Sequence, residues 1–272
     1  MCRLAIVLLF VGGLATGCGG GGSEAEETES PSELQDPLAR PSVDGLFEVT
    51  VEGRRLRLNC WGEGSPTVVL ESGHPDGTGI AVFDETAFAR KIAAETRVCA
   101  YDRAGWGGSD PAPNEPRSAD DVVDDLHELL QAADVDAPFV LAGSSFGGMI
   151  VSYYAERYPE DVAGVVLLDV PAPSATLSAA EIPEIAWDHP DNPEHVDVAP
   201  EFENRFANDP VRFSAPLVVI TATRGQSNVE DQKIWLRSSP DARQIELEGG
   251  HTVYLDDPEG AAAEVLALVR GA

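Results

Sequence analysis

Positive charge is scarce in this chain of 272 residues. Lys and Arg together number 18, only two of them Lys, whereas Asp and Glu number 47, so the formal net charge is -29. Such an excess of negative charge repels phosphate backbones, which argues against nucleic-acid partners. The same acidity keeps a protein soluble, and it fits either a salty habitat or an ordinary compositional bias.

The apolar run at the N-terminus is short for a transmembrane helix. Residues 1–17 carry one cation, Arg3, then an apolar run and small residues, which is typical of a signal peptide. Residues 14–18 are similar to a bacterial lipobox, in which the cysteine, here Cys18, becomes the lipid-modified first residue of the mature protein. We therefore expect an exported, cell-surface lipoprotein that meets the membrane only through this anchor. A soluble secreted protein with a fortuitous cysteine is the alternative.

Periodic apolar residues are absent from the segment that follows. Residues 19–22 are all Gly, and residues 23–43 are acidic and interrupted by Pro. Residues 18–45 are therefore predicted to be the lipidated cysteine and a disordered acidic linker. The remaining residues, 46–272, suffice for one domain with a sizeable core, and nothing demands a second one. We take a monomer as the default oligomeric state.

Cysteine is rare as well, with four in the chain. Cys2 would leave with the signal peptide, and Cys18 would carry the lipid. Cys60 and Cys99 are then the pair left in the exported domain.

Eight segments rich in apolar residues are predicted as β-strands. Some, such as residues 67–70, are apolar without interruption, which is typical of strands buried on both faces of a parallel sheet. The strands are expected at residues 46–51, 55–61, 66–71, 96–101, 138–141, 162–168, 216–221 and 242–247. Helices are expected at residues 83–95, after a cap at Ser118, and after a cap at Asp257. His127 is expected to be a solvated residue of the second helix.

One short stretch, residues 143–147, has the spacing Gly-x-Ser-x-Gly. It lies between the apolar run 138–141 and a segment of helical period, residues 149–155. This predicts a strand that turns sharply into a helix, with Ser145 at the tip of the turn. A serine hydroxyl is a weak nucleophile until a base takes its proton, so this interpretation needs a histidine and a carboxylate elsewhere. A glycine-rich turn with an incidental serine is the alternative.

With this turn, the chain over residues 46–272 resembles the α/β-hydrolase superfamily, in its serine-esterase branch. The resemblance implies an α/β fold: a mostly parallel eight-stranded sheet with helices on both faces and a short lid, at about residues 172–215, inserted after the sixth strand. It also implies that His251, after the last strand, is the base. Ser145 disfavours the epoxide-hydrolase and dehalogenase branches, which have aspartate at this position.

The resemblance leaves two places for the acid of the triad. In many relatives the acid follows the seventh strand, where this chain has Gly225 and no carboxylate. In others it follows the sixth strand, where Asp169 lies. Asp169 is therefore the implied acid, with Asp231 or Glu230 as substitutes, and the chain order Ser, Asp, His is kept. An ordinary strand-end cap is the alternative role for Asp169.

Two backbone N–H groups complete the implied site. Those of His74 and Phe146 would donate to an oxyanion, whereas Pro75 has no N–H to offer. The His74 side chain either faces the pocket or has no role beyond its backbone. His189 and His195 lie near acidic residues and are of types that can bind a metal, but they lie in a flexible loop, so no metal is expected there. No cofactor is expected either.

The sheet order of the resembled fold implies one more feature. It makes the strands that contain Cys60 and Cys99 antiparallel neighbours, so we expect a disulfide between them in an exported domain. Two separately buried thiols are the alternative.

The function that the resemblance implies is a serine hydrolase that cleaves a small or medium carboxylic ester through an acyl-enzyme. Two other classes stay open. One is a different hydrolysis by the same triad, such as peptide or carbon–carbon bond cleavage. The other is a non-catalytic relative that binds a ligand without turning it over.

Overall fold

The structure is a computed structural model that describes residues 45–74, 77–172, 179–180, 182–201, 211–225 and 228–272. The predicted signal peptide, Cys18 and nearly all of the predicted linker lie outside the described residues, as do parts of the predicted lid. None of the helices within these ranges is long and apolar enough to cross a membrane.

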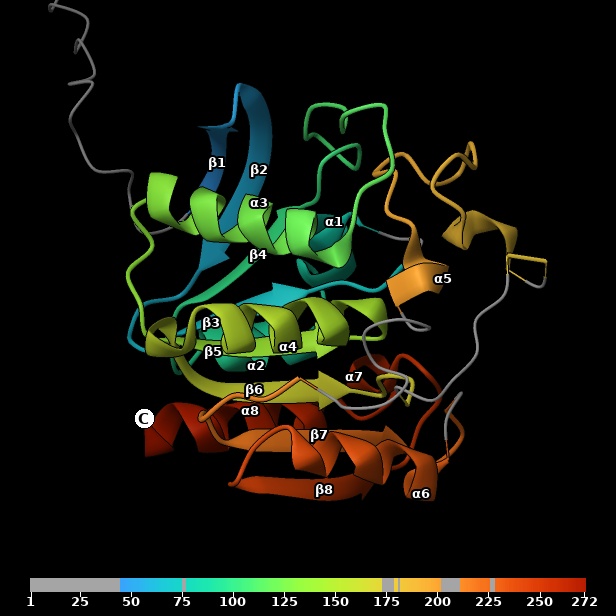
Figure 1. The fold of residues 1–272 in the computed structure, drawn as a ribbon. Coiled ribbons are helices and arrows are strands. Elements are labelled where there is room, and N and C mark those ends of the chain that lie inside the picture. Colours follow the sequence, from blue (N-terminus) through green and yellow to red (C-terminus); the bar gives the residue numbers. More distant parts are fainter. Residues whose placement is uncertain (1–44, 75–76, 173–178, 181, 202–210, 226–227) are drawn as a thin grey trace, which may run out of the picture. The chain divides into compact units, whose positions relative to one another are not determined.

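An eight-stranded sheet forms the centre of the described chain (Figure 1). Its order is β1-β2-β4-β3-β5-β6-β7-β8. β2 is antiparallel to β1 and β4, and the other neighbours are parallel, so the predicted fold class is confirmed. The strands are β1 (Gly45–Val51), β2 (Arg54–Trp61), β3 (Thr67–Glu71), β4 (Val98–Asp102), β5 (Phe139–Ser144), β6 (Val162–Leu168), β7 (Leu217–Ala222) and β8 (Ala242–Leu247).

The burial of each strand follows its place in the sheet. β3, β4 and β5 are buried along their whole length because helices cover both faces of the sheet there. β1, at one edge, alternates between half-buried and exposed residues. This difference accounts for the uninterrupted apolar runs of the central strands.

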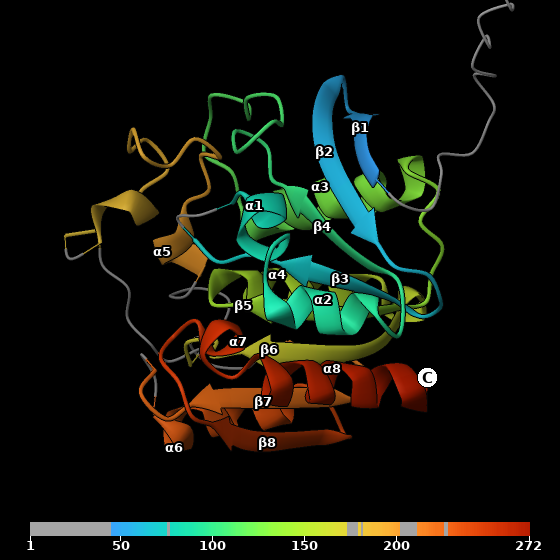
Figure 2. The same ribbon diagram turned by 180° about the vertical axis from the view of Figure 1, so that it is seen from behind.

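Helices cover the sheet on both faces (Figures 1 and 2). On one face, α3 (Ala119–Ala132) and α4 (Phe146–Arg157) pack against each other and share one apolar cluster with the sheet. On the other face, α2 (Ala87–Ala93) and α8 (Pro258–Gly271) pack against each other in a second cluster. The shorter helices are α1 (Gly79–Phe83), α5 (Val198–Glu201), α6 (Val229–Gln232) and α7 (Val253–Asp256), with 3-10 turns at Pro159–Asp161, Pro183–Ile185 and Lys233–Arg237.

Two predicted caps are present, and one predicted helix is shorter than expected. The hydroxyl of Ser118 accepts the N–H of Asp121, whose carboxylate accepts the N–H of Ser118. Asp257 caps α8 by accepting the N–H of Gly260. The helix expected at residues 83–95 is α2, which begins only at Ala87 because Thr86 is its N-cap, and Phe83 instead ends α1.

Cys60 and Cys99 are joined by a disulfide in the structure. They are directly opposed on the antiparallel pair β2 and β4, with Cα atoms 4.1 Å apart. Both residues are fully buried.

Candidate active site

Ser145 occupies a sharp turn between β5 and α4. Its φ angle is 53°, a left-handed conformation that is uncommon for residues other than glycine and typical of strained functional sites. The turn requires glycine at position 143, since a Cβ there would lie 2.3 Å from the carbonyl oxygen of Gly147. The predicted strand–turn–helix geometry is therefore what the chain forms.

The two predicted oxyanion donors belong to segments next to Ser145. Phe146 is the first residue of α4, so its N–H has no partner within the helix and lies at the positive end of the helix dipole. The loop after β3 approaches Ser145 closely, because a Cβ built on Gly73 would lie 3.1 Å from the Cβ of Ser145. The peptide group that joins Gly73 to His74 is thus beside the serine side chain.

Asp169 and His251 are joined by a hydrogen bond. Nδ1 of His251 lies 2.8 Å from Oδ2 of Asp169, which directly follows β6. The carboxylate is fully buried, whereas the histidine side chain is 25% exposed. A carboxylate on Nδ1 fixes the imidazole so that Nε2 is the nitrogen free to act as a base.

Neighbours hold the other oxygen of Asp169. Oδ1 accepts the N–H of Ala222 at 3.2 Å and the side-chain amide of Gln232 at 3.1 Å. The carboxylate also fills the space beside Gly225, where a Cβ would lie 2.3 Å from Oδ2. A carboxylate from β6 therefore takes the place where many relatives have one after β7, and this explains why position 225 is glycine.

The two substitute acids make local contacts instead. Asp231 bonds to Asn228 at the start of α6, both through its backbone N–H and through its side chain. Glu230 pairs with Lys233 at 2.5 Å, and its side chain is largely exposed. Of the three carboxylates considered, the structure brings Asp169 to His251.

Asp256 contacts the histidine loop, a role that the sequence did not indicate. Its carboxylate accepts the N–H of Gly250 at 2.6 Å, which holds the residue before His251. A carboxylate five residues after the base was the only available signal, and the sequence alone does not tell such a brace from an ordinary helix residue.

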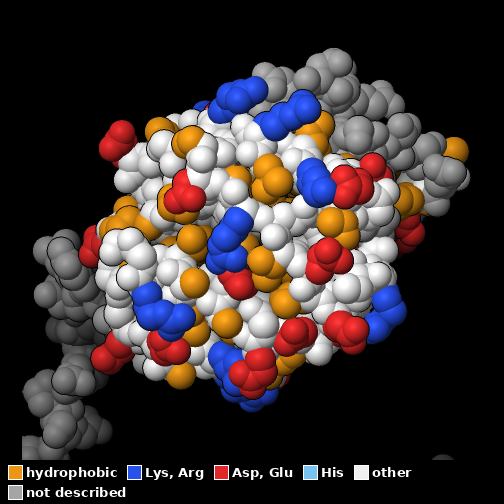
Figure 3. Space-filling view, turned by 90° about the horizontal axis from the view of Figure 1, so that it is seen from below, with side chains coloured by type: hydrophobic (Ala, Val, Ile, Leu, Met, Phe, Trp, Pro, Cys, Tyr) orange, Lys and Arg blue, Asp and Glu red, His pale blue; other side chains and the backbone are white. Residues whose placement is uncertain are grey.

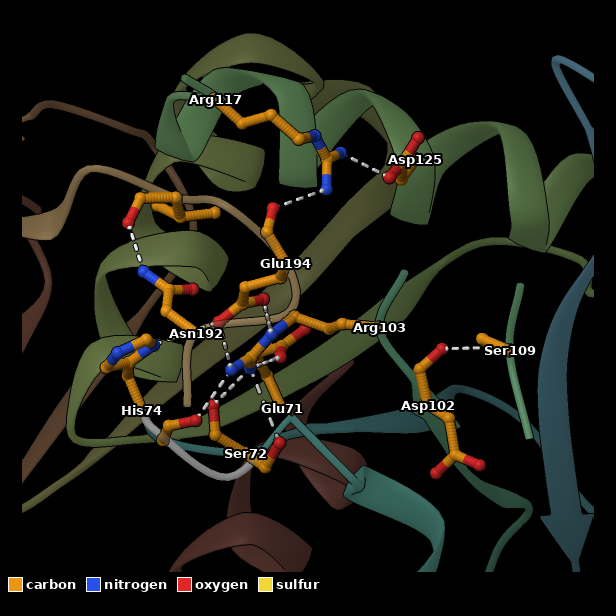
Figure 4. A network of polar contacts seen from close by, with 12 residues as sticks. Glu71, Ser72, His74, Asp102, Arg103, Ser109, Arg117, Asp125, Asn192 and Glu194 are labelled. Atoms are coloured by element: carbon orange, nitrogen blue, oxygen red, sulfur yellow. Dashed lines mark hydrogen bonds and ion pairs between the residues drawn. The ribbon is translucent and has the colours of Figure 1, made fainter. Parts of the chain in front are cut away.

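Four ionisable side chains form a buried cluster beside the loop after β3 (Figure 4). Arg103 bonds to Glu71 at 2.7 Å and to Glu194, which comes from the predicted lid, at 2.7 Å and 3.1 Å. Nδ1 of His74 lies 2.9 Å from Glu194, and Nε2 lies 2.8 Å from the carbonyl oxygen of Glu184. The His74 side chain therefore contacts the lid.

The charges in this cluster shift one another's pKa values. Burial alone raises the pKa of Glu194, but the charge of Arg103 and the hydrogen bonds from His74 and Arg103 outweigh it and lower the pKa to about 2. Burial raises the pKa of Glu71 in spite of Arg103. Burial opposes the charge on Arg103, yet the two carboxylates raise its pKa above the usual value. Glu194 and Arg103 therefore form the charged pair of the cluster at neutral pH.

His127, on α3, makes contacts of another kind. His127 is half-buried and stacks on the ring of Tyr158, with centroids 3.6 Å apart, so its prediction as a solvated residue was wrong. Tyr158 lies at the end of α4, and only tertiary packing brings it to α3. Within the described ranges, no three His, Cys, Asp or Glu residues are placed to hold a metal ion.

The fold and the turn define a class, and comparison with known proteins supports the same fold. A family model described as the alpha/beta hydrolase fold matches residues 66–196, just under half of the chain, a stretch that includes Ser145 and Asp169. Together with the sheet order and the similarity to solved structures, this match shows that the chain has the α/β-hydrolase fold. His251 lies beyond the matched residues and is placed by the structure alone.

Similar proteins differ in the reactions that they are named for. An esterase from Thermogutta terrifontis is 20% identical, with a TM-score of 0.66 over 84% of this chain and 98% of its own. A meta-cleavage product hydrolase from Pseudomonas fluorescens is 19% identical, with a TM-score of 0.62 and the same coverage. Mouse epoxide hydrolase 4 is 32% identical over 152 residues, which are 55% of this chain and 40% of that protein. The chain spans less than half the length of the curated relatives it matches.

Proposed function

We propose that the protein is a serine hydrolase that cleaves carboxylic esters of small or medium size, with Ser145 as nucleophile, His251 as base and Asp169 as acid. The observation that carries the proposal is the bond between His251 Nδ1 and the buried carboxylate of Asp169, at the same end of the sheet as the strained turn at Ser145. This arrangement supplies the two partners that a serine nucleophile needs.

The proposed reaction has two halves. Nε2 of His251 takes the proton of Ser145 as the serine oxygen attacks the ester carbonyl, and the N–H groups of His74 and Phe146 stabilise the oxyanion. His251 then gives its proton to the leaving alcohol, and an acyl-enzyme remains. Water, activated by the same nitrogen, attacks the acyl group, which releases the acid and restores the serine.

The side chain at the turn supports an ester substrate over an epoxide. In the epoxide-hydrolase branch an aspartate at this position attacks the ring, whereas this chain has Ser145. Peptide and carbon–carbon bond cleavage by the same three residues remain alternatives, since the same triad chemistry serves all three reactions.

Hydrolysis of p-nitrophenyl esters of increasing acyl length tests the proposal. We expect turnover on the shorter esters, and we expect Ser145→Ala to lose it apart from the small residual rate due to binding and the oxyanion hole. Ser152→Ala is the matched control, because that hydroxyl lies on the same helix and donates only to the carbonyl of Gly148, at 2.7 Å. Equal turnover by wild type and Ser145→Ala would contradict the proposal. Cleavage of a peptide anilide or a vinylogous diketone, without ester turnover, would favour an alternative.

A further inference from the structure

The guanidinium of Arg103 holds the loop that would carry one oxyanion donor. Nη1 donates to the carbonyl of Ser72 at 2.8 Å, and Nη2 donates to the carbonyl of Gly73 at 2.7 Å (Figure 4). Arg103 is almost fully buried, and the carboxylates of Glu71 and Glu194 hold its guanidinium in place. The loop after β3 is therefore bonded to a side chain that cannot easily move.

Bonding to the Gly73 carbonyl sets the direction of the His74 N–H. Both groups belong to one peptide unit, and in a planar trans peptide C=O and N–H point in opposite directions. With the carbonyl held toward Arg103, the N–H must point away from Arg103. Gly73 already packs against Ser145, so the orientation of this peptide decides whether the N–H can serve an oxyanion there.

The lid carboxylate Glu194 holds both sides of this peptide. Its two oxygens accept from Nε and Nη2 of Arg103, and one of them also meets Nδ1 of His74. The other ring nitrogen of His74 faces the carbonyl of Glu184. The His74 ring is thus held between two residues of the predicted lid.

Backbone bonds fix the segment around Glu194 to the body of the domain. The N–H of Arg117 donates to the carbonyl of His195 at 2.8 Å, and the N–H of Asp197 donates to the carbonyl of Arg117 at 2.9 Å. Gly105 also lies against this segment, since a Cβ there would be 2.2 Å from the carbonyl oxygen of Pro193. This part of the lid is therefore docked on the connection between β4 and α3, which also carries Arg103.

We propose that Glu194 is a positioning residue of the active site: through Arg103 and His74, this lid carboxylate orients the Gly73–His74 peptide so that its N–H serves the oxyanion hole. The inference rests on the proposed function, and it makes docking of this lid segment a condition for fast catalysis. Substrate binding does not depend on it, because the oxyanion forms only during the reaction.

Replacement of Glu194 by its amide tests the proposal. Glu194→Gln keeps the size of the side chain but removes the charge and one of the two acceptors. We expect kcat on p-nitrophenyl butyrate to fall about tenfold or more while KM stays within about twofold. The affinity for a boronic acid, which forms a tetrahedral adduct with the serine, should fall by a similar factor. The matched control is Asp191→Asn, which removes a lid carboxylate that is 78% exposed.

Different results separate this proposal from the proposed function. If folded Glu194→Gln matches the wild type in kcat and boronic acid affinity, Glu194 does not position the oxyanion hole, although the wild-type turnover still supports a serine esterase. Equal losses in substrate and boronic acid binding would indicate a merely structural role and would also overturn the proposal. A wild type without turnover or labelling would instead contradict the proposed function itself. If Glu194→Gln fails to fold, Arg103→Lys decides by the same measurements, since it keeps the charge but loses the forked donors to Ser72 and Gly73.

Discussion

At the level of single residues, two positions in the sequence bear on the acid of the proposed triad: Asp169 after β6 and Gly225 after β7. The absence of a carboxylate at Gly225 was visible in the sequence, and so was Asp169 at the end of β6. What the sequence could not supply was the spatial relation: the carboxylate of Asp169 lies against Gly225 and reaches His251. Glycine at position 225 is thus part of the arrangement, since a side chain there would displace the acid.

Asp169→Asn is expected to lower kcat by about a thousandfold or more with little change in KM. The amide can hold the wrong tautomer of His251, whereas it leaves the binding of substrate largely intact. Steady-state kinetics on a p-nitrophenyl ester measure both constants. Asp231→Asn is the matched control and should behave like the wild type. The assignment would move to the β7 side if Asp169→Asn stayed active and Asp231→Asn did not.

The stability of the protein in acid should depend on Glu194. Its pKa is about 2 in the folded protein against 4.5 for an unperturbed glutamate, so its contribution is full above about pH 4.5 and is lost as the pH falls toward 2. The shift corresponds to about 3 kcal/mol of unfolding free energy. Glu71 shifts in the opposite direction, so its protonation on acidification favours the folded state and offsets part of this loss.

Denaturant unfolding at pH values from 7 down to 3 measures this dependence. The difference in unfolding free energy between wild type and Glu194→Gln should shrink as the pH falls below about 4.5. The exposed variant Asp191→Asn should differ from the wild type by a small amount at every pH. A difference for Glu194→Gln that stays constant over the same range would show that the carboxylate is not stabilised by its neighbours.

At the level of elements, apolar runs and capping residues predicted the strands and the main helices. Contacts between residues far apart in the sequence could not be predicted from these patterns. The strands were found from their composition, and Ser118 and Asp257 cap helices as expected. The start of α2 was predicted four residues too early, a local error, because Thr86 fits either a helix interior or an N-cap. Glu194 could not be predicted to meet Arg103, since 91 residues separate them and lid segments have no periodicity to interpret.

The disulfide between β2 and β4 should stabilise the domain. It closes a loop with a sequence separation of 39 residues, for which the chain-entropy model gives about 3 to 4 kcal/mol. We expect reduction to lower the denaturant midpoint, and we expect peptide mapping without reductant to recover the two cysteine peptides joined. Recovery of both as free thiols would refute the bond.

At the scale of the whole molecule, the site results from the sheet order. The loops after β3, β5, β6 and β8 leave the same edge of the sheet, because the carboxyl ends of parallel strands meet there. Loops far apart in sequence are thereby brought to one edge: Gly73 packs against Ser145, and His251 bonds to Asp169. The resemblance made this prediction possible, since the order of the strands cannot be deduced from the periodicity of each one.

One face of the molecule mixes the two signs of charge in spite of the acidic composition. Figure 3 shows a face on which Lys and Arg side chains lie among Asp and Glu side chains. Several of the cations are paired, for example Arg270 with Glu95 at 2.9 Å and Lys91 with Glu259 at 2.5 Å. Such exposed pairs contribute little stability.

Labelling of the protein with a fluorophosphonate, followed by mass spectrometry of the adduct, tests directly whether Ser145 is the nucleophile. We expect wild type and Ser152→Ala each to gain one adduct that maps to Ser145, and Ser145→Ala to gain none. Equal labelling of wild type and Ser145→Ala, or an adduct on another residue, would contradict the claim that Ser145 is the nucleophile.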